Sequence, residues 1–165
     1  MRLKTATAGL ATALTAAGLV AAGIPVQAHA QSTSAAESFT IVVAGNAPQL
    51  FVARGAVDVT GTAVEEVSEG ASGGTDVVRV PGGTFMLTLQ NTSGGGTPVN
   101  PVTCVATFFG AGTFTIFDGT GQFAGIAGSG TITFHGAFIA KPTPQGCSQQ
   151  GTEFDLVLGH GNLTV

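Results

Sequence analysis

Apolar and polar residues alternate along most of the chain beyond residue 38. Phe85, Leu87 and Leu89, for example, share one face of an extended segment, while threonine and methionine side chains occupy the other. A period of two predicts β-strands, and no useful length of chain beyond the first thirty residues carries a glycine-free helical stripe. The predicted strands cover residues 38–45, 49–60, 62–68, 75–80, 84–91, 101–109, 112–118, 130–140 and 153–164, some of which merge.

Turn signals separate these segments. Pro81-Gly82-Gly83 lies between two alternating runs and predicts an antiparallel hairpin. Two glycine-rich stretches, residues 69–74 and 93–97, are expected to form flexible loops. Short strands joined by short turns predict an all-β fold, a single antiparallel barrel of about eight strands, with a β-sandwich as the alternative.

One glycine-dense stretch lies between two of the predicted strands. Phe123 and Ile126 are set among its glycines, which are Gly119, Gly121, Gly125, Gly128 and Gly130. We expect a tight bend in which Phe123 and Ile126 plug the barrel. A phosphate-binding loop is excluded, because the stretch contains no Lys or Arg and no helix is expected after it.

The first thirty residues have the pattern of a secretory signal peptide. Arg2 and Lys4 precede an uncharged stretch, and Ala28-His29-Ala30 supplies a small-x-small cleavage pattern. A transmembrane anchor is the alternative, which the alanine and threonine content and the cleavage pattern disfavour. We therefore expect a secreted protein cleaved between Ala30 and Gln31, with a disordered segment over residues 31–38 and a barrel domain over residues 39–165.

Charge excludes two classes of partner. Without the signal peptide the chain keeps three cations, Arg54, Arg79 and Lys141, against nine acids, which gives a net charge of −6. Nucleic-acid binding needs a basic patch, and attraction to anionic lipid needs a polybasic segment. Neither is present in the sequence, so we expect no nucleic-acid partner and no membrane association after the signal peptide is removed.

Cys104 and Cys147 are the two cysteines of the chain. An even pair in an exported protein predicts a disulfide, here closing a loop of 43 residues. The pair has neither CxxC spacing nor a neighbouring pair of histidines, which disfavours metal binding and redox chemistry. We expect no metal and no cofactor.

The glycine-dense stretch resembles the Gly-Thr-Gly-x-Phe-x-Gly-x-x-Gly pattern of the allene oxide cyclase barrel-like and dirigent-like group, small β-barrels of the calycin type. Residues 53–61 and 76–84 resemble the group more weakly, and the likeness covers residues 39–140. It implies a barrel of about eight strands with an apolar cavity, often oligomeric. Known members include cyclases, proteins that guide radical coupling and exported bacterial proteins of unknown function. This chain lacks tyrosine, which several members place in the cavity.

Candidate catalytic residues are few: Arg54, Asp58 and His135. Arg54 and Asp58 share the strand face opposite Phe51. One interpretation is a weak surface ion pair; the other places them inside a polar-lined barrel, where they orient a substrate and Asp58 acts as acid or base. His135 alternates with apolar neighbours and is expected to face solvent.

The remaining acids show no catalytic pattern. Glu65, Glu66 and Glu69 are expected to be solvated beside a glycine-rich loop. In the last predicted strand, Phe154, Leu156 and Leu158 form an apolar face opposite Glu153 and Asp155.

The function that the sequence favours is non-catalytic: binding of an apolar small molecule, or a structural extracellular module. One alternative, which the resemblance supports, is an isomerase or cyclase acting in the barrel cavity. The other is a self-associating cell-envelope protein, suggested by threonine-rich strand faces, so a homo-oligomer is among the predicted partners. Projection of Arg54, Asp58, Glu66, Arg79 or His135 into a cavity of a few hundred Å³ favours the enzyme.

Overall fold

A computed structural model describes residues 33–68 and 70–165. Two short 3-10 helices, η1 (Gly70–Ser72) and η2 (Gly121–Phe123), interrupt a series of eight strands. The strands are β1 (Ser34–Ala44), β2 (Gln49–Gly55), β3 (Val59–Ser68), β4 (Gly73–Val80), β5 (Gly83–Gly96), β6 (Val105–Phe117), β7 (Ala127–Thr143) and β8 (Gly146–Thr164).

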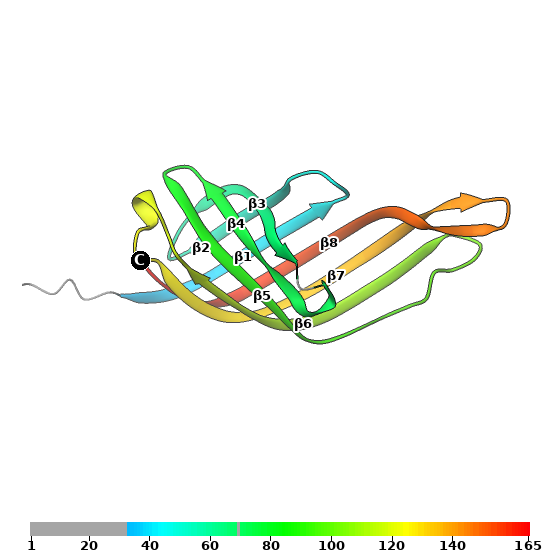
Figure 1. Cartoon of the computed structure of the whole chain (residues 1–165). Helices are drawn as coiled ribbons and strands as arrows, with labels where there is room; N and C mark the ends of the chain where they lie inside the picture. Colours follow the sequence, from blue (N-terminus) through cyan, green and yellow to red (C-terminus); the bar gives the residue numbers. More distant parts are fainter. Residues whose placement is uncertain (1–32, 69) are drawn as a thin grey trace, which may run out of the picture. The chain divides into compact units, whose positions relative to one another are not determined.

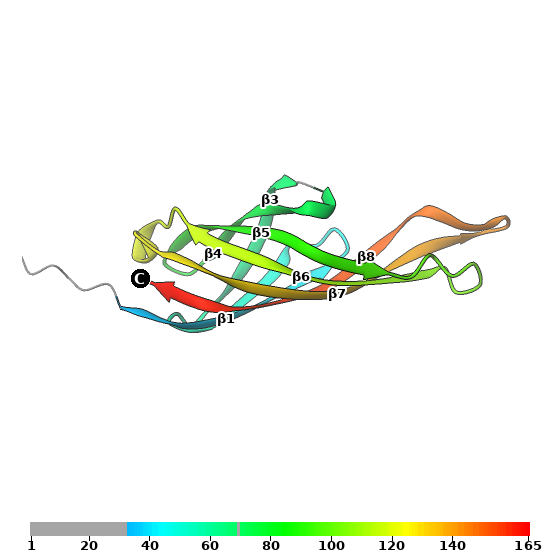
Figure 2. The same cartoon turned by 90° about the horizontal axis from the view of Figure 1, so that it is seen from below.

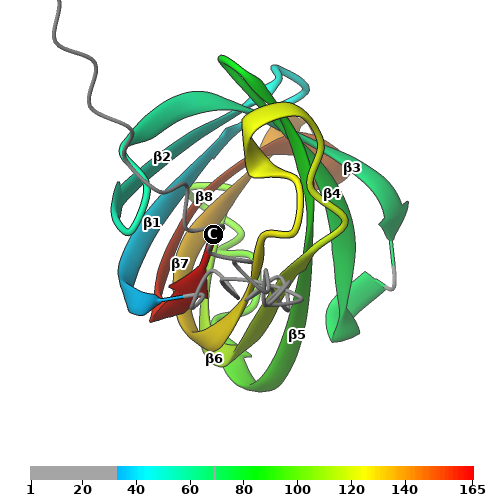
Figure 3. The same cartoon turned by 90° about the vertical axis from the view of Figure 1, so that its left-hand side faces the viewer.

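The strands form one closed antiparallel ring. Each pairs with the next along the chain, and β1 pairs with β8 over Ser34–Ala44, so the sheet has no free edge between them (Figures 1 and 3). This up-and-down order explains the short connections, because consecutive antiparallel strands need only a tight turn. The all-β barrel predicted from the alternating pattern is confirmed, and the sandwich alternative is wrong. The segments predicted over residues 101–109 and 112–118 merge into β6, which begins only at Val105, so residues 101–104 belong to the connection before it.

The two ends of the barrel differ. At one end η2 and the β4–β5 turn lie together, joined by hydrogen bonds from Thr120 N to Thr84 O and from Gln122 N to Gly82 O (Figure 3). At the other end the β7–β8 hairpin extends beyond the shorter strands, beside the connection between β5 and β6 (Figures 1 and 2). The predicted bend at the glycine-dense stretch is therefore the η2 end, where Phe123 and Ile126 are each only 2% exposed.

A chain of phenylalanine rings fills the η2 end of the barrel. Ring centroids lie 4.9 Å apart for Phe39 and Phe114, 5.6 Å for Phe39 and Phe51, and 5.7 Å for Phe51 and Phe85. Phe123 continues the chain from Phe85, again at 5.7 Å. Edge-to-face and offset contacts at these spacings stabilise each pair by about 0.5–1.5 kcal/mol beyond the burial of apolar area.

Glycines on the neighbouring strands make room for the rings. Five inward phenylalanines lie directly opposite a glycine in the register: Phe39 and Gly159, Phe51 and Gly61, Phe108 and Gly136, Phe114 and Gly130, and Phe134 and Gly110. A Cβ added at Gly130 would lie 2.6 Å from Cε1 of Phe114, closer than any real contact. The many glycines of the chain thus serve packing inside the ring as well as turns.

Three local expectations were wrong. Residues 34–38, expected to be disordered, begin β1 and pair with β8. Residues 93–96, expected to be a loop, lie in β5 opposite β6, after a register shift between Asn91 and Ser93. Residues 141–150, in which Pro142, Pro144 and Gly146 predict a loop without regular structure, extend the β7–β8 hairpin, with Pro142 opposite Cys147 after another shift. At a β-bulge an extra residue is accommodated and strand pairing continues beyond it, so segments whose glycine or proline content predicts a loop can still be paired strands.

Cys104 and Cys147 form the predicted disulfide, with Cα atoms 5.4 Å apart. It joins the connection before β6 to the start of β8, and so ties together the two extensions at that end of the barrel. The predicted signal peptide, its cleavage between Ala30 and Gln31, and residues 31 and 32 lie outside the described residues.

Replacing both cysteines by alanine is expected to lower the free energy of unfolding by up to about 4 kcal/mol, because the unfolded chain loses a 43-residue loop constraint. Urea unfolding of the oxidised protein and of the double variant measures the difference. A reductant serves as the control: it should destabilise the wild type to the same extent and leave the double variant unchanged. Equal midpoints for oxidised wild type and variant would contradict the prediction.

Candidate functional site: an acidic cavity in the open half of the barrel

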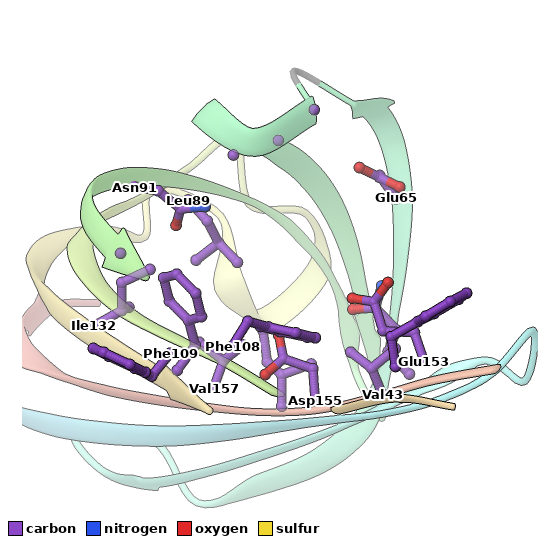
Figure 4. Close-up of a pocket in the computed structure, with 18 of the residues that line it drawn as sticks. Val43, Glu65, Leu89, Asn91, Phe108, Phe109, Ile132, Glu153, Asp155 and Val157 are labelled. Carbon is purple, nitrogen blue, oxygen red and sulfur yellow. The ribbon is translucent and has the colours of Figure 1, made fainter. Parts of the chain in front are cut away.

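The half of the barrel beyond the phenylalanine chain is hollow. A cavity of about 860 Å³ opens between the β1–β2 turn, η1 and the start of β8. Its apolar wall comes mainly from β1 and from the Phe-rich faces of β6 and β7, and Figure 4 shows Val43, Leu89, Phe108 and Ile132 around the space. A volume of this size is typical of sites that enclose a small organic molecule.

Two acids line the wall formed by β3 and β4. Glu65 and Asp76 lie directly opposite each other in the register, and both border the cavity. Glu65 is exposed at the mouth, whereas Asp76 is only 5% exposed. No described residue donates a hydrogen bond to the Asp76 carboxyl or forms an ion pair with it. Burial, and secondarily the nearby charge of Glu65, raises the pKa of Asp76 to about 6.

Two more acids line the wall formed by β8. Glu153 and Asp155 lie two residues apart and border the same cavity, across from Glu65 (Figure 4). Burial raises the pKa of Asp155 to about 6, and the charge of Glu153 acts in the same direction. The Leu156 backbone N–H and His135 partly oppose that rise. Oδ1 of Asp155 is buried and has no hydrogen-bond partner among the described residues.

The position of these acids corrects the expected faces of the last strand. Val157 pairs with Ile41 and Phe134, which face inward, whereas Leu156 pairs with Val42 and His135, which face outward. Directly opposed residues share a face, so the odd-numbered positions of β8 face the interior. Phe154 and Leu156 are accordingly 43% and 40% exposed. A sequence signal for this choice of face exists: Gly159 and Gly161 alternate near the end of β8, and glycines on the inward face leave room for inward-pointing rings.

None of the residues predicted as catalytic borders the cavity. Arg54 and Asp58 are exposed and form an ion pair of 3.8 Å between Nε and Oδ1, the surface interpretation considered from the sequence. His135 is exposed on the outer face of β7, where its ring lies 6.5 Å from that of Phe109. Glu66 and Arg79 are also exposed and outside the cavity lining. Glu69 lies outside the described residues.

Besides Asp76, one other acid of the described residues is fully buried: Glu37, at the filled end of the barrel. Its Oε2 accepts a hydrogen bond of 2.9 Å from the Val57 backbone N–H, which anchors the connection between β2 and β3. Its Oε1 is buried without a partner among the described residues, and burial raises the pKa of the carboxyl. Glu37 does not border the cavity, so we assign it a structural role.

Metal binding finds no support in the described part of the chain, where no three His, Cys, Asp or Glu side chains gather closely enough to hold an ion. The same residues include no helix long and apolar enough to cross a membrane.

The outer face of the ring carries exposed apolar side chains. Leu50, Val42 and Leu156 are neighbours in one row across β2, β1 and β8, and are 45%, 38% and 40% exposed. Phe109 follows in the same row on β6 beyond His135 and is 55% exposed, and it also borders the cavity (Figure 4). Apolar rows of this kind are typical of association surfaces, and the homo-oligomer expected from the sequence stays a prediction.

Comparison with known proteins adds no relative: no family model, no curated protein and no solved structure matches the chain.

Through the raised pKa of Asp76, we expect the barrel to be less stable at neutral pH than in mild acid. Unfolded Asp76 ionises at its ordinary pKa of 3.8, whereas the folded group keeps its proton up to about pH 6. The destabilisation is therefore fully present above the folded pKa and disappears as the pH falls to the unfolded pKa. Asp155 contributes with the same sign.

Asp76→Asn is expected to raise the free energy of unfolding at about pH 7.5 by up to about 3 kcal/mol, and to flatten its pH dependence. Urea unfolding at about pH 7.5 and about pH 4.5 measures both effects. Asp58→Asn is the matched control, since Asp58 is 74% exposed and its change should stay below about 1 kcal/mol. A destabilised Asp76→Asn variant at neutral pH would show that the carboxylate is paired in the folded protein.

Proposed function

We propose that this protein is a secreted, disulfide-stabilised β-barrel that binds an apolar small molecule in the open half of the ring. The observation that carries the proposal is the cavity of about 860 Å³, whose apolar wall of phenylalanine, leucine, isoleucine and valine side chains lies beside the acidic and amide residues that complete its lining. Burial of apolar ligand surface against such a wall is the main driving force for binding. The disulfide fits an extracellular location, because such bonds persist in oxidising compartments.

The division of the barrel supports binding over a purely structural role. A structural module gains stability from a completely filled interior, yet side chains fill only the η2 end here. The wall of the hollow half is made of paired strands, including β7 and β8, whose register is regular from Ala127 to Ala140. A rigid, preformed cavity loses little entropy on binding.

Val43→Trp is expected to weaken binding of the uncharged fluorophore N-phenylnaphthylamine by at least about tenfold, because the indole occupies the cavity. Fluorescence titration of the purified protein measures the affinity. Val42→Trp is the matched control: Val42 is the adjacent residue of β1, faces outward and is 38% exposed, so this variant should bind like the wild type.

Leu89→Trp, from β5, repeats the test should Val43→Trp fail to fold. Absence of fluorophore binding by the wild type, or equal binding by the wild type and a folded cavity variant, would count against the proposal.

A second candidate, in keeping with the resemblance to allene oxide cyclase-like and dirigent-like barrels, is an isomerase or cyclase acting in the same cavity. Asp76 and Asp155 favour it, because a carboxyl with a pKa of about 6 both donates and accepts protons near neutral pH. Native mass spectrometry of protein from the secreted fraction identifies any retained ligand. If the protein only binds, that ligand is recovered unchanged after incubation; conversion by the wild type and not by Asp76→Asn would favour the enzyme.

A further inference from the structure

The charge of the cavity restricts what it binds. Four carboxyl groups border it, from Glu65, Asp76, Glu153 and Asp155. No Lys, Arg or His is among the lining residues. The barrel's three cations lie elsewhere: Arg54 and Arg79 are exposed on the outer face, and Lys141 is exposed on the β7–β8 hairpin. The acids are therefore not neutralised from within the site.

Two of these acids are also unsatisfied. Asp76 is 95% removed from solvent relative to a free side chain, borders the cavity and has no hydrogen-bond or ion-pair partner among the described residues. Oδ1 of Asp155 is buried without a partner. Buried charged groups in folded proteins are normally paired, because an unpaired buried charge is costly. The carboxyl of Asp76 on the β3–β4 wall and Oδ1 of Asp155 on the β8 wall, both without a partner and both at one cavity, point to a partner that arrives with the ligand.

We propose that the ligand is an organic ammonium cation with an apolar body, a deeper account of the same site that rests on the proposed binding function. The ammonium group lies among the carboxyl groups of the β3–β4 and β8 walls, and the body packs against the phenylalanine wall. Phe108 and Phe134, whose ring faces attract cations as well as apolar groups, suit both parts of such a molecule.

Other ligand classes fit the site less well. A neutral apolar molecule leaves the carboxyl groups unpaired, and an organic anion is repelled by them. A divalent metal ion needs several oxygens converging at about 2.0–2.6 Å. The described acids form no such group, because one pair lies on the β3–β4 wall and the other on β8.

The experiment uses three molecules of nearly the same size: phenylbutylamine, phenylbutanol and phenylbutyrate, which are cationic, neutral and anionic near neutral pH. Isothermal titration calorimetry of the disulfide-bonded protein at about pH 7.5 is expected to show the amine binding at least about tenfold more tightly than the alcohol, and the carboxylate more weakly than either. The alcohol reports the apolar cavity alone, and the ratio of amine to alcohol affinity reports the charge.

Variants locate the effect. Asp76→Asn and Asp155→Asn are each expected to reduce the ratio of amine to alcohol affinity several-fold while leaving alcohol binding nearly unchanged. Asp58→Asn removes the same charge from the outer surface and should leave the ratio as in the wild type. Glu65→Gln, at the exposed mouth, provides a further variant if either buried substitution prevents folding.

The same ratio should fall as the pH is lowered from about 7.5 to about 5, because Asp76 and Asp155 take up protons. The charged group that acts on Asp76 is Glu65, opposite it on β3. On β5 its partner is Leu87, which carries no charge. Asp155 is influenced by Glu153 on β8 and His135 on β7, and its partner on β1, Val43, does not titrate.

The outcomes separate the two proposals. Equal affinity for amine and alcohol, or an amine preference that survives both aspartate substitutions, overturns the ammonium assignment and leaves the binding function standing. Failure of the amine, the alcohol and N-phenylnaphthylamine alike to bind overturns the binding function, and the ammonium assignment with it.

Discussion

The interior of this barrel depends on phenylalanine rings lying over glycines of the neighbouring strand. A phenylalanine ring inside the barrel needs space that a side chain on the opposite residue would occupy. A glycine in that position leaves the backbone free for the ring to pack against. Five such pairs run around the ring, among them Phe39 with Gly159 and Phe114 with Gly130. They let a small ring of eight strands hold a continuous aromatic chain at one end. Closure of the sheet then follows without exposed edges.

The same pairing decides which end is filled. At the η2 end the rings meet one another and Phe123 and Ile126 complete the core. Toward the mouth, Phe108 and Phe134 also lie over glycines, but the facing wall of β3 and β4 offers Glu65 and Asp76 in place of large apolar side chains. Space therefore remains between the walls. The cavity results from a change in inward-facing residues along otherwise regular strands.

Much of this architecture could be predicted from the alternating pattern, because period-two alternation and turn residues are local properties. The all-β ring followed from this pattern. The disulfide between Cys104 and Cys147 followed from the even pair of cysteines, and the burial of Phe123 and Ile126 from the glycine-dense stretch between two strands. The acids of the site did not. Alternation gives two faces for each strand and does not say which faces inward, so an apolar face containing Phe154 and Leu156 was a reasonable choice for the core.

Closure of the ring decides which face of β8 points inward, and it is the face opposite to that of Phe154 and Leu156. β8 pairs with both β1 and β7, so each of its residues must share the face of a partner on either side. The packing of Phe39 and Phe114 over Gly159 and Gly130 places the glycine positions of β8 inside, and Asp155 and Glu153 follow with the same parity. That arrangement exposes Leu156 and half-buries the Asp155 carboxyl, both unfavourable for an isolated barrel. Apolar residues of similar size would make the barrel more stable than Asp76 and Asp155 do, so these acids are better explained by the proposed binding of a cationic ligand than by the stability of the barrel.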